Sequence, residues 1–243
     1  MNERVATGIA GLDEMLSGGF LRGTCVLVRG APGTGKTTLA LQYLHHGATQ
    51  LSEPGLWISF EQFPQSLYRD AVGLGWDLKA LETAGHLHML FTSPEVFLRS
   101  LEVPDSPLNV LLHEGRVRRV VLDSITHFLR LTDDTHELRR LYTSAINGLR
   151  REGVTTLLLG EEGRDDVHRH EQGRLSFIAD GVVMLRYVEV ESAMQRAVLV
   201  LKLRGSAHSK DIRRFEIRKG GLFVTTPFAG REGVLSGMPR RTG

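Results

Sequence analysis

The chain has 243 residues, of which 41% are hydrophobic and 24% are charged, a composition typical of a globular protein and not of a disordered or fibrous one. Its 30 lysines and arginines nearly balance 28 aspartates and glutamates, which excludes the broad positive field of a general nucleic-acid binder. No apolar stretch approaches the roughly 20 residues that are needed to cross a bilayer.

Two further features bear on the compartment. Cys25 is the single cysteine, so no intrachain disulfide can form, and this predicts a reducing, cytoplasmic setting. The N-terminal stretch MNERVATGIAGLDEML is mixed and charged and lacks the apolar segment of a signal peptide. We therefore expect the protein to be made and kept in the cytosol.

Short apolar runs recur along the first two thirds of the chain. They are CVLV (25–28), LWISF (56–60), HLHMLF (86–91), VVL (120–122) and VTTLLL (154–159). These runs are dense rather than alternating, which indicates strands buried on both faces of a parallel sheet.

Helix-like segments lie between these runs. The segment that begins at Lys36 is expected to stop at Gly47, and the next begins at Pro64 and ends near Gly75. EVFLRSLEV (95–103) and a longer segment that ends at Gly153 follow. Strands that alternate with helices predict an α/β fold with a mostly parallel central sheet flanked by helices.

The pattern changes after residue 180. The segments 181–190, 197–205, 213–219 and 221–226 are strand-like and are separated by short turns. They predict an antiparallel C-terminal extension of the same sheet, so that residues 1–226 form a single domain. Residues 227–243 are expected to form a C-terminal tail.

The stretch GAPGTGKTT at 30–38 matches the pattern G-x-x-x-x-G-K-[ST], which occurs once in the chain. It follows a predicted strand and begins a predicted helix, which is the context that this pattern requires. Gly30, Gly33 and Gly35 permit backbone conformations that other residues avoid. The N–H groups of the loop, Thr34 included, can then surround a phosphate at a helix N-terminus. The alternative is a glycine-rich turn that caps an ordinary helix.

Three polar side chains follow these glycines. Lys36 is a compact cation that reaches the β- and γ-phosphates, and the Thr37 hydroxyl is placed to ligate Mg²⁺. Thr38 begins the helix and can donate to the α-phosphate.

Two carboxylates complete the predicted site. Asp123 ends the strand in RRVVLDS, at the edge where open α/β sheets bind ligands, and is a candidate for holding the Mg²⁺ shell. Glu61 follows the strand in LWISFEQFP and is a candidate for orienting the attacking water close to the metal. The alternatives are an aspartate that caps the next helix and a glutamate favoured by a helix dipole.

Together these residues resemble the KaiC-like branch of the RecA superfamily of ATPases. The resemblance covers nearly the whole chain and is carried by RVATGIAGLDEMLSGGF (4–20), SFEQ (59–62), GWDL (75–78), ADGVVMLRYVEV (179–190) and LKLRGSAH (201–208). It implies a RecA-like fold and Mg²⁺-dependent ATP hydrolysis. Adenine specificity rests on the resemblance alone, because a P-loop contacts the phosphates of a nucleotide and not its base. Leu74 matches a base-side position of the family, and Trp76 is either a second such contact or a core residue.

The resemblance also implies that Lys202 and Arg204 act on the nucleotide of a neighbouring subunit. On a strand these two cations share one face, and Gly205 then turns the chain. The alternative is a charged edge-strand face that blocks aggregation. Further positions that match nucleotide contacts of the family are Arg196, Leu203, Ser206, His208 and Lys210. The implied assembly is a homo-oligomeric ring, commonly a hexamer, because cations supplied in trans require a closed heterologous interface.

The chain departs from the family pattern in three places. Gln62 stands where many members have a second glutamate, so Glu61 is the single candidate for activating water. One P-loop excludes a double ring from one polypeptide and argues against a circadian oscillator. Ser176 matches an autophosphorylated serine of the clock proteins, but Phe177 replaces the threonine beside it. A weak serine autokinase and a purely structural Ser176 are therefore both open.

Other functions share this fold. A recombination-accessory ATPase needs basic, aromatic DNA-binding loops, whereas the candidate loop at 161–174 has five carboxylates against three arginines and no aromatic residue. DNA binding is therefore not expected, and HRH (168–170) in this loop indicates a solvated segment rather than a metal site. The remaining alternative is a binding module whose nucleotide state switches a signalling partner with little turnover. The sequence favours a regulatory or signalling ATPase with ATP and Mg²⁺ as ligands.

Overall fold

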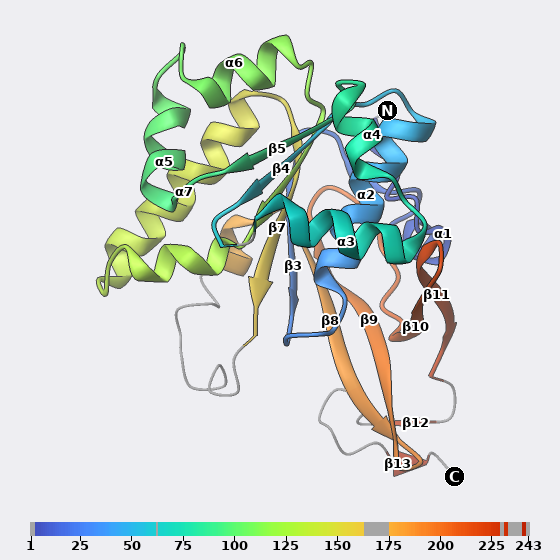
Figure 1. Cartoon of the computed structure of the whole chain (residues 1–243). Helices are drawn as coiled ribbons and strands as arrows, with labels where there is room; N and C mark the ends of the chain where they lie inside the picture. Colours follow the sequence, from blue (N-terminus) through green and yellow to red (C-terminus); the bar gives the residue numbers. More distant parts are fainter. Residues whose placement is uncertain (1–2, 62, 163–174, 229–230, 233–239, 242–243) are drawn as a thin grey trace.

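The computed structural model describes residues 3–61, 63–162, 175–228, 231–232 and 240–241. Among these residues, nine strands form one mixed sheet (Figure 1). In spatial order they are β11 (Gly221–Pro227), β10 (Arg213–Arg218), β9 (Ala193–Leu203), β8 (Gly181–Val190), β3 (Cys25–Gly30), β7 (Thr155–Glu161), β6 (Arg119–Asp123), β4 (Gly55–Ser59) and β5 (Leu87–Phe91).

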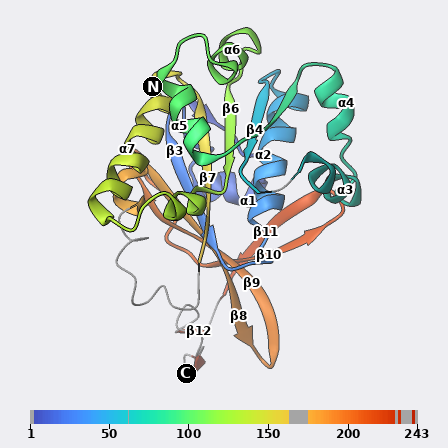
Figure 2. The same cartoon turned by 60° about the vertical axis from the view of Figure 1, so that its left-hand side comes forward.

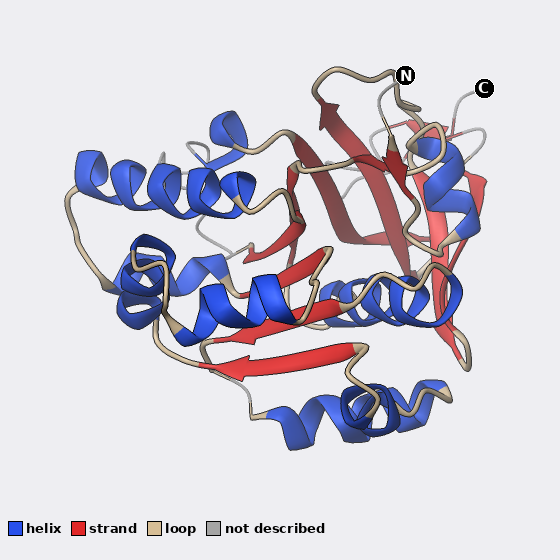
Figure 3. Cartoon of the chain, turned by 90° about the horizontal axis from the view of Figure 1, so that it is seen from above, coloured by secondary structure: helices blue, strands red, loops and turns tan. Residues whose placement is uncertain are grey.

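Helices cover both faces of this sheet, as the view from above shows (Figure 3). They are α1 (Ala10–Met15), α2 (Lys36–Gln50), α3 (Pro64–Leu74), α4 (Leu78–Thr83), α5 (Pro94–Glu102), α6 (Pro107–Glu114), the 3₁₀ helix η1 (Ile125–Arg130) and α7 (Thr135–Arg151). Two small antiparallel pairs complete the described elements: β1 (Arg4–Val5) with β2 (Phe20–Leu21), and β12 (Arg231–Glu232) with β13 (Arg240–Arg241).

Strand directions confirm the prediction of a mostly parallel sheet with an antiparallel C-terminal extension. β8, β3, β7, β6, β4 and β5 run parallel to one another, whereas β9, β10 and β11 pair antiparallel. The β8–β9 connection is a two-residue turn in which Glu191 and Ser192 have φ of 52° and 61°, values that suit the twist of a tight hairpin. This hairpin projects beyond the rest of the sheet (Figures 1 and 2).

Two hydrophobic cores explain why the apolar runs are dense. Along β3, Val26 and Val28 pack into the core beneath α2 and α3, while Cys25 and Leu27 pack into the core beneath α5, α6 and α7. Figure 2 shows these two helical layers on opposite sides of the sheet. A strand that is covered on both faces needs apolar residues at successive positions, so the alternation of a half-exposed strand is absent from β3.

The predicted stop at Gly47 is wrong, because α2 continues through this residue to Gln50. Arg119 lies fully buried beside the glycine, and a Cβ at Gly47 would stand 2.4 Å from the Arg119 Cδ and Nε. The Arg119 guanidinium donates to the Glu53 carboxylate at 2.7 Å and to the Tyr43 carbonyl at 2.9 Å. Gly47 therefore leaves room for the buried Arg119 side chain, which is paired with Glu53, and it does not end the helix.

Three sequence predictions concern the C-terminal boundary of the domain and segments outside the described residues. β11 ends at Pro227, one residue past the expected domain boundary, and the short β12–β13 pair lies within the expected tail. Gln62, the HRH segment and most of the loop 161–174 lie outside the described residues. Among the described helices, none combines the length and apolar character of a membrane span.

We expect Gly47→Ala to lower the free energy of unfolding by about 1–3 kcal/mol, because the added methyl group collides with the fixed Arg119 side chain. Gly73→Ala is the matched control, because a Cβ at Gly73 in α3 meets nothing within 4 Å. The control is expected to change stability by at most about 1 kcal/mol, as a gain from helix propensity. Urea unfolding of the two variants measures the contrast, and equal stabilities would contradict the packing role of Gly47.

Candidate functional site

The carboxyl ends of β3, β4, β6 and β7 meet at one edge of the sheet, because these strands are parallel neighbours. The loops that leave this edge line a pocket of about 210 Å³. Its lining residues are Pro32, Gly33, Lys36, Thr37, Glu61, Asp123, Ser124, His127 and Glu161. Ligands of open α/β sheets bind at this kind of edge. The pocket therefore brings together the predicted P-loop lysine and threonine and both predicted carboxylates.

Two of the three glycines of the loop 30–35 have the predicted backbone, whereas Gly30 is not among the residues with positive φ and is required for close packing instead. Gly33 and Gly35 have φ of 77° and 108°, which side-chain-bearing residues rarely adopt. At Gly30 a Cβ would lie 2.5 Å from both the Leu185 carbonyl oxygen and the Thr34 hydroxyl. Thr34 is fully buried, and its hydroxyl donates to the Ala31 carbonyl at 2.8 Å. Its side chain therefore shapes the loop from inside.

Lys36 is the first residue of α2 and is 9% exposed. Its ammonium group donates to the carbonyls of Gly30 at 2.8 Å and Ala31 at 3.1 Å. Burial lowers the pKa of Lys36, and the carboxylates of Glu161 and Asp123 oppose this shift. The cation is thus held at the mouth of the loop by two neutral carbonyls, which phosphate oxygens can replace with stronger charge-assisted bonds.

Asp123 ends β6 and lines the same pocket as Lys36. Burial raises the pKa of Asp123 to about 6. The cation of Lys36 opposes this rise, while the carboxylates of Glu161 and Glu61 add to it. This side chain is therefore a carboxyl group whose charged form is destabilised until a further cation approaches.

Oxygen donors in the pocket fit a magnesium ion that is shared with a nucleotide. Within the described ranges, no group of three or more His, Cys, Asp and Glu side chains can hold a metal ion by itself. Mg²⁺ at phosphate sites is bound by one or two protein oxygens together with phosphates and water. The Thr37 hydroxyl and the Asp123 carboxylate, which both line the pocket, supply this partial set, and Glu61 lines the same pocket.

Three residues of the site escaped the sequence analysis. His127 lines the pocket, and its Nε2 lies 3.0 Å from the Glu61 carboxylate. Glu161 lines the pocket at the end of β7. The Tyr187 hydroxyl, from β8, donates to the Gly33 carbonyl at 2.7 Å and so anchors the tip of the loop. Glu161 follows a predicted strand as Glu61 and Asp123 do, so strand position was a usable signal for it.

Comparison with known proteins decides the family. A family model of the KaiC ATPases matches residues 5–228, which is most of the chain. The chain belongs to the KaiC family of ATPases.

Individual KaiC relatives agree with this result. The circadian clock oscillator protein KaiC of Prochlorococcus marinus is 34% identical over 236 residues, which cover 91% of this chain and 45% of that protein. The circadian clock protein KaiC3 of a Synechocystis strain is 32% identical over 246 residues, which cover 98% of this chain and 47% of that protein. This chain thus spans about half the length of the curated relatives that it matches.

A solved structure supports the RecA-like fold prediction. The crystal structure of a KaiC-like protein from Pyrococcus horikoshii superposes with a TM-score of 0.82 at 32% sequence identity. The match covers 93% of this chain and all of that one. Membership of the KaiC family supports nucleotide binding and ATPase function in general.

The KaiC-like segment 201–208 runs away from the P-loop, toward the opposite edge of the sheet. The Arg204 N–H donates to the Asp180 carbonyl, and the Asp180 N–H donates to the Cys25 carbonyl, each at 2.8 Å. Arg204 is therefore level with the first residue of β3, whereas Gly30 is the last. Five residue steps of roughly 3.3 Å separate these positions by about 16 Å along the strand. Lys202 is level with Leu27 in the middle of β3, because Val182 pairs with both of these residues. Neither Lys202 nor Arg204 is among the residues that line the phosphate pocket.

These two cations have partners within the chain. The Lys202 ammonium donates to the carbonyls of Ser176 at 2.8 Å and Ala179 at 2.7 Å. An Arg204 Nη donates to the Phe177 carbonyl at 2.5 Å. Burial lowers the pKa of Lys202, and the Arg204 charge lowers it further. Both cations therefore contact the turn at 175–179, which carries the predicted phosphosite Ser176.

The other predicted contacts are scattered in this single chain. Leu203 is buried in the core under α2, Ser206 accepts from Arg4 at 2.6 Å, and Arg196 lies beside the Tyr187 ring at 5.3 Å. His208 and Lys210 follow in the segment after β9, outside the phosphate pocket. Leu74 and Trp76 belong to the core beneath α2 and α3, where the Trp76 ring stacks on His45 at 4.9 Å.

Asp123→Asn tests the electrostatics of the pocket. Between pH 4 and 6 the folded chain keeps a proton on Asp123 that the unfolded chain releases, because the folded pKa is about 6 against an ordinary 3.8. Stability is therefore lost as pH rises through this window. Without metal or nucleotide, the variant is expected to exceed the wild type in free energy of unfolding by about 1–3 kcal/mol at pH 8, with no difference near pH 4. Urea unfolding measures this, and a less stable variant at pH 8 would contradict it.

Proposed function

We propose that the protein is a Mg²⁺-dependent ATPase that works as a homo-oligomeric ring, a hexamer, with each ATP between two subunits. The observation that carries this proposal is that Arg204 is level with the first residue of β3 and Lys202 with the third, whereas the P-loop pocket lies at the carboxyl end of this strand. A chain whose cations lie away from its own pocket can use them on the pocket of a neighbour. Such a heterologous interface closes into a ring when its rotation permits.

The pocket side supplies binding and water. Lys36 and the loop N–H groups hold the β- and γ-phosphates, while Thr37 and Asp123 hold the metal that neutralises phosphate charge. Glu61 orients the attacking water. Lys202 and Arg204 of the adjacent copy face the charge that spreads over the γ-phosphoryl oxygens, as an arginine finger does.

A regulatory role follows from the same arrangement. Two of the relatives named above are circadian clock proteins, and this chain spans about half their length. We infer that the nucleotide state of the ring is passed to a signalling partner through the subunit interface. DNA is not part of this proposal, because the near-neutral charge balance offers no field for it.

A weak autokinase at Ser176 is a second candidate. The carbonyl of Ser176 accepts from Lys202, so a ring that brings Lys202 to a neighbouring γ-phosphate brings the Ser176 region there as well. Intact-mass measurement after incubation with MgATP tests this, and an unchanged mass in an ATP-hydrolysing sample rejects it.

Mixing two inactive variants tests the shared site. Glu61→Gln removes the water-orienting carboxylate but keeps Lys202 and Arg204, while Arg204→Ala keeps an intact pocket. Each alone is expected to lose about 100-fold or more in ATP turnover. In randomly mixed rings about a quarter of the sites combine an intact pocket with an intact Arg204, so phosphate release recovers to about that fraction of the wild type.

The control is a mixture of Glu61→Gln with Lys36→Ala. Both changes lie on the pocket side, so no site regains an intact pocket and turnover stays low. Native mass measurement establishes that subunits exchange in both mixtures. Exchange without recovery in the first mixture would contradict the trans arrangement, and a wild type that binds MgATP without turnover would favour the binding-module alternative.

A further inference from the structure

His127 contacts the candidate water-orienting carboxylate directly. Its Nε2 lies 3.0 Å from a Glu61 carboxylate oxygen. The His127 side chain is only 9% exposed, whereas that of Glu61 is 66% exposed. A buried ring therefore holds a side chain that otherwise reaches into solvent.

The backbone of η1 fixes this ring in place. η1 begins two residues after Asp123, and the His127 N–H donates to the Ser124 carbonyl at 3.1 Å. The ring packs edge-on against Phe60, with centroids 6.3 Å apart and an interplanar angle of 75°. Phe60 directly precedes Glu61. His127 therefore contacts two successive residues, because its ring packs on Phe60 and its Nε2 is hydrogen-bonded to Glu61.

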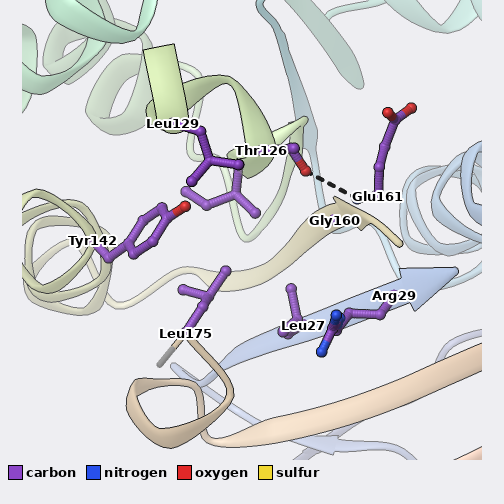
Figure 4. Close-up of a pocket in the computed structure, with 9 residues that line it drawn as sticks. Leu27, Arg29, Thr126, Leu129, Tyr142, Gly160, Glu161 and Leu175 are labelled. Carbon is purple, nitrogen blue, oxygen red and sulfur yellow. Dashed lines mark hydrogen bonds between the residues drawn. The ribbon is translucent and has the colours of Figure 1, made fainter. Parts of the chain in front are cut away.

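The opposite side of η1 is anchored to β7. The hydroxyl of Thr126 accepts the Glu161 backbone N–H at 2.9 Å, as the dashed line in Figure 4 shows. Behind η1, the cavity that Leu27, Leu129 and Tyr142 help to line measures about 20 Å³, which is room for about one water. η1 is therefore tied to β7 at Thr126, and the next residue, His127, lines the phosphate pocket.

Chemistry fixes the direction of the hydrogen bond. An ionised carboxylate only accepts hydrogen bonds, so His127 donates from Nε2 to Glu61. Among the described residues, His127 supplies the hydrogen bond to this carboxylate. The second carboxylate oxygen stays available to accept from a water.

We propose that His127 is a positioning residue that holds the Glu61 carboxylate in the orientation needed to direct the attacking water. This rests on the proposed ATPase function and extends it to a residue with no place in the P-loop, strand-end or 201–208 motifs. His127 acts through Glu61, so its contribution is to turnover rather than to nucleotide affinity. Gln places an amide N–H donor at nearly the same reach as the imidazole Nε2, whereas Leu fills similar space without a donor.

The test compares His127→Leu with His127→Gln in steady-state MgATP hydrolysis. The Leu variant is expected to lose about 10- to 100-fold in kcat, the range for a misplaced catalytic group. Its KM for ATP and its affinity for a fluorescent ADP analogue are expected to stay within about twofold of the wild type. The Gln variant is expected to recover most of kcat. In a Glu61→Ala background, His127→Leu is expected to add nothing, because coupled residues are not additive.

His113→Leu is the matched control. His113 and Glu152 form a pair of similar length, 3.1 Å, away from the pocket lining, so its loss leaves kcat unchanged. Unchanged or faster turnover in His127→Leu overturns the proposal. A weakened ADP affinity also overturns it, as does a loss of kcat in the Glu61→Ala background equal to the loss in the wild-type background. Thermal unfolding shows whether His127→Leu keeps its fold. If it does not, the kcat of His127→Gln tests the proposal. A wild type without ATP turnover defeats the ATPase proposal instead.

Discussion

Parallel pairing of β3, β7, β6 and β4 is the constraint on which the rest of this molecule depends. Parallel strands carry their carboxyl ends to one edge, so Gly30, Ser59, Asp123 and Glu161 lie there together. The same pairing sends β8 alongside β3 and returns β9 antiparallel. Arg204 therefore lies at the other edge, and Lys202 lies level with the middle of β3. In the proposed ring, this geometry places the two cations on the site of a neighbouring copy.

Electrostatics at the pocket edge lowers the stability of the folded chain. Lys36 and Asp123 are both destabilised as charged groups by burial. Their mutual attraction offsets only part of this penalty, because Glu161 and Glu61 add like charge around Asp123. A phosphate near Lys36 and a divalent cation near Asp123 relieve both penalties together. In the proposed function, binding of the metal–nucleotide pair is therefore favoured by the electrostatic penalty that burial imposes on these two side chains.

The packing behind the pocket supports this arrangement. Arg119, at the start of β6, is fully buried between α2 and the Glu53 carboxylate, and Gly47 leaves room for it. α2 is thereby held against the sheet at its C-terminal half, while its N-terminus carries Lys36 in the pocket. The other wall is η1, which Thr126 ties to β7. The phosphate loop thus leads into a packed helix, and η1 carries His127, which contacts the candidate water-orienting Glu61. A reaction that depends on orientation requires such support.

The sequence by itself determined the alternation of strands and helices, the antiparallel C-terminal extension, the strand–loop–helix context of GAPGTGKTT and the family to which the chain belongs. These features are local in sequence, because dense apolar runs, glycine spacing and turn residues act within a few positions. The tertiary structure alone decided that Gly47 makes room for Arg119, that His127 contacts Glu61, and that Tyr187 holds Gly33. The residues of each pair lie roughly 60 to 160 positions apart in the sequence. No local pattern encodes a contact that forms only when distant strands pair.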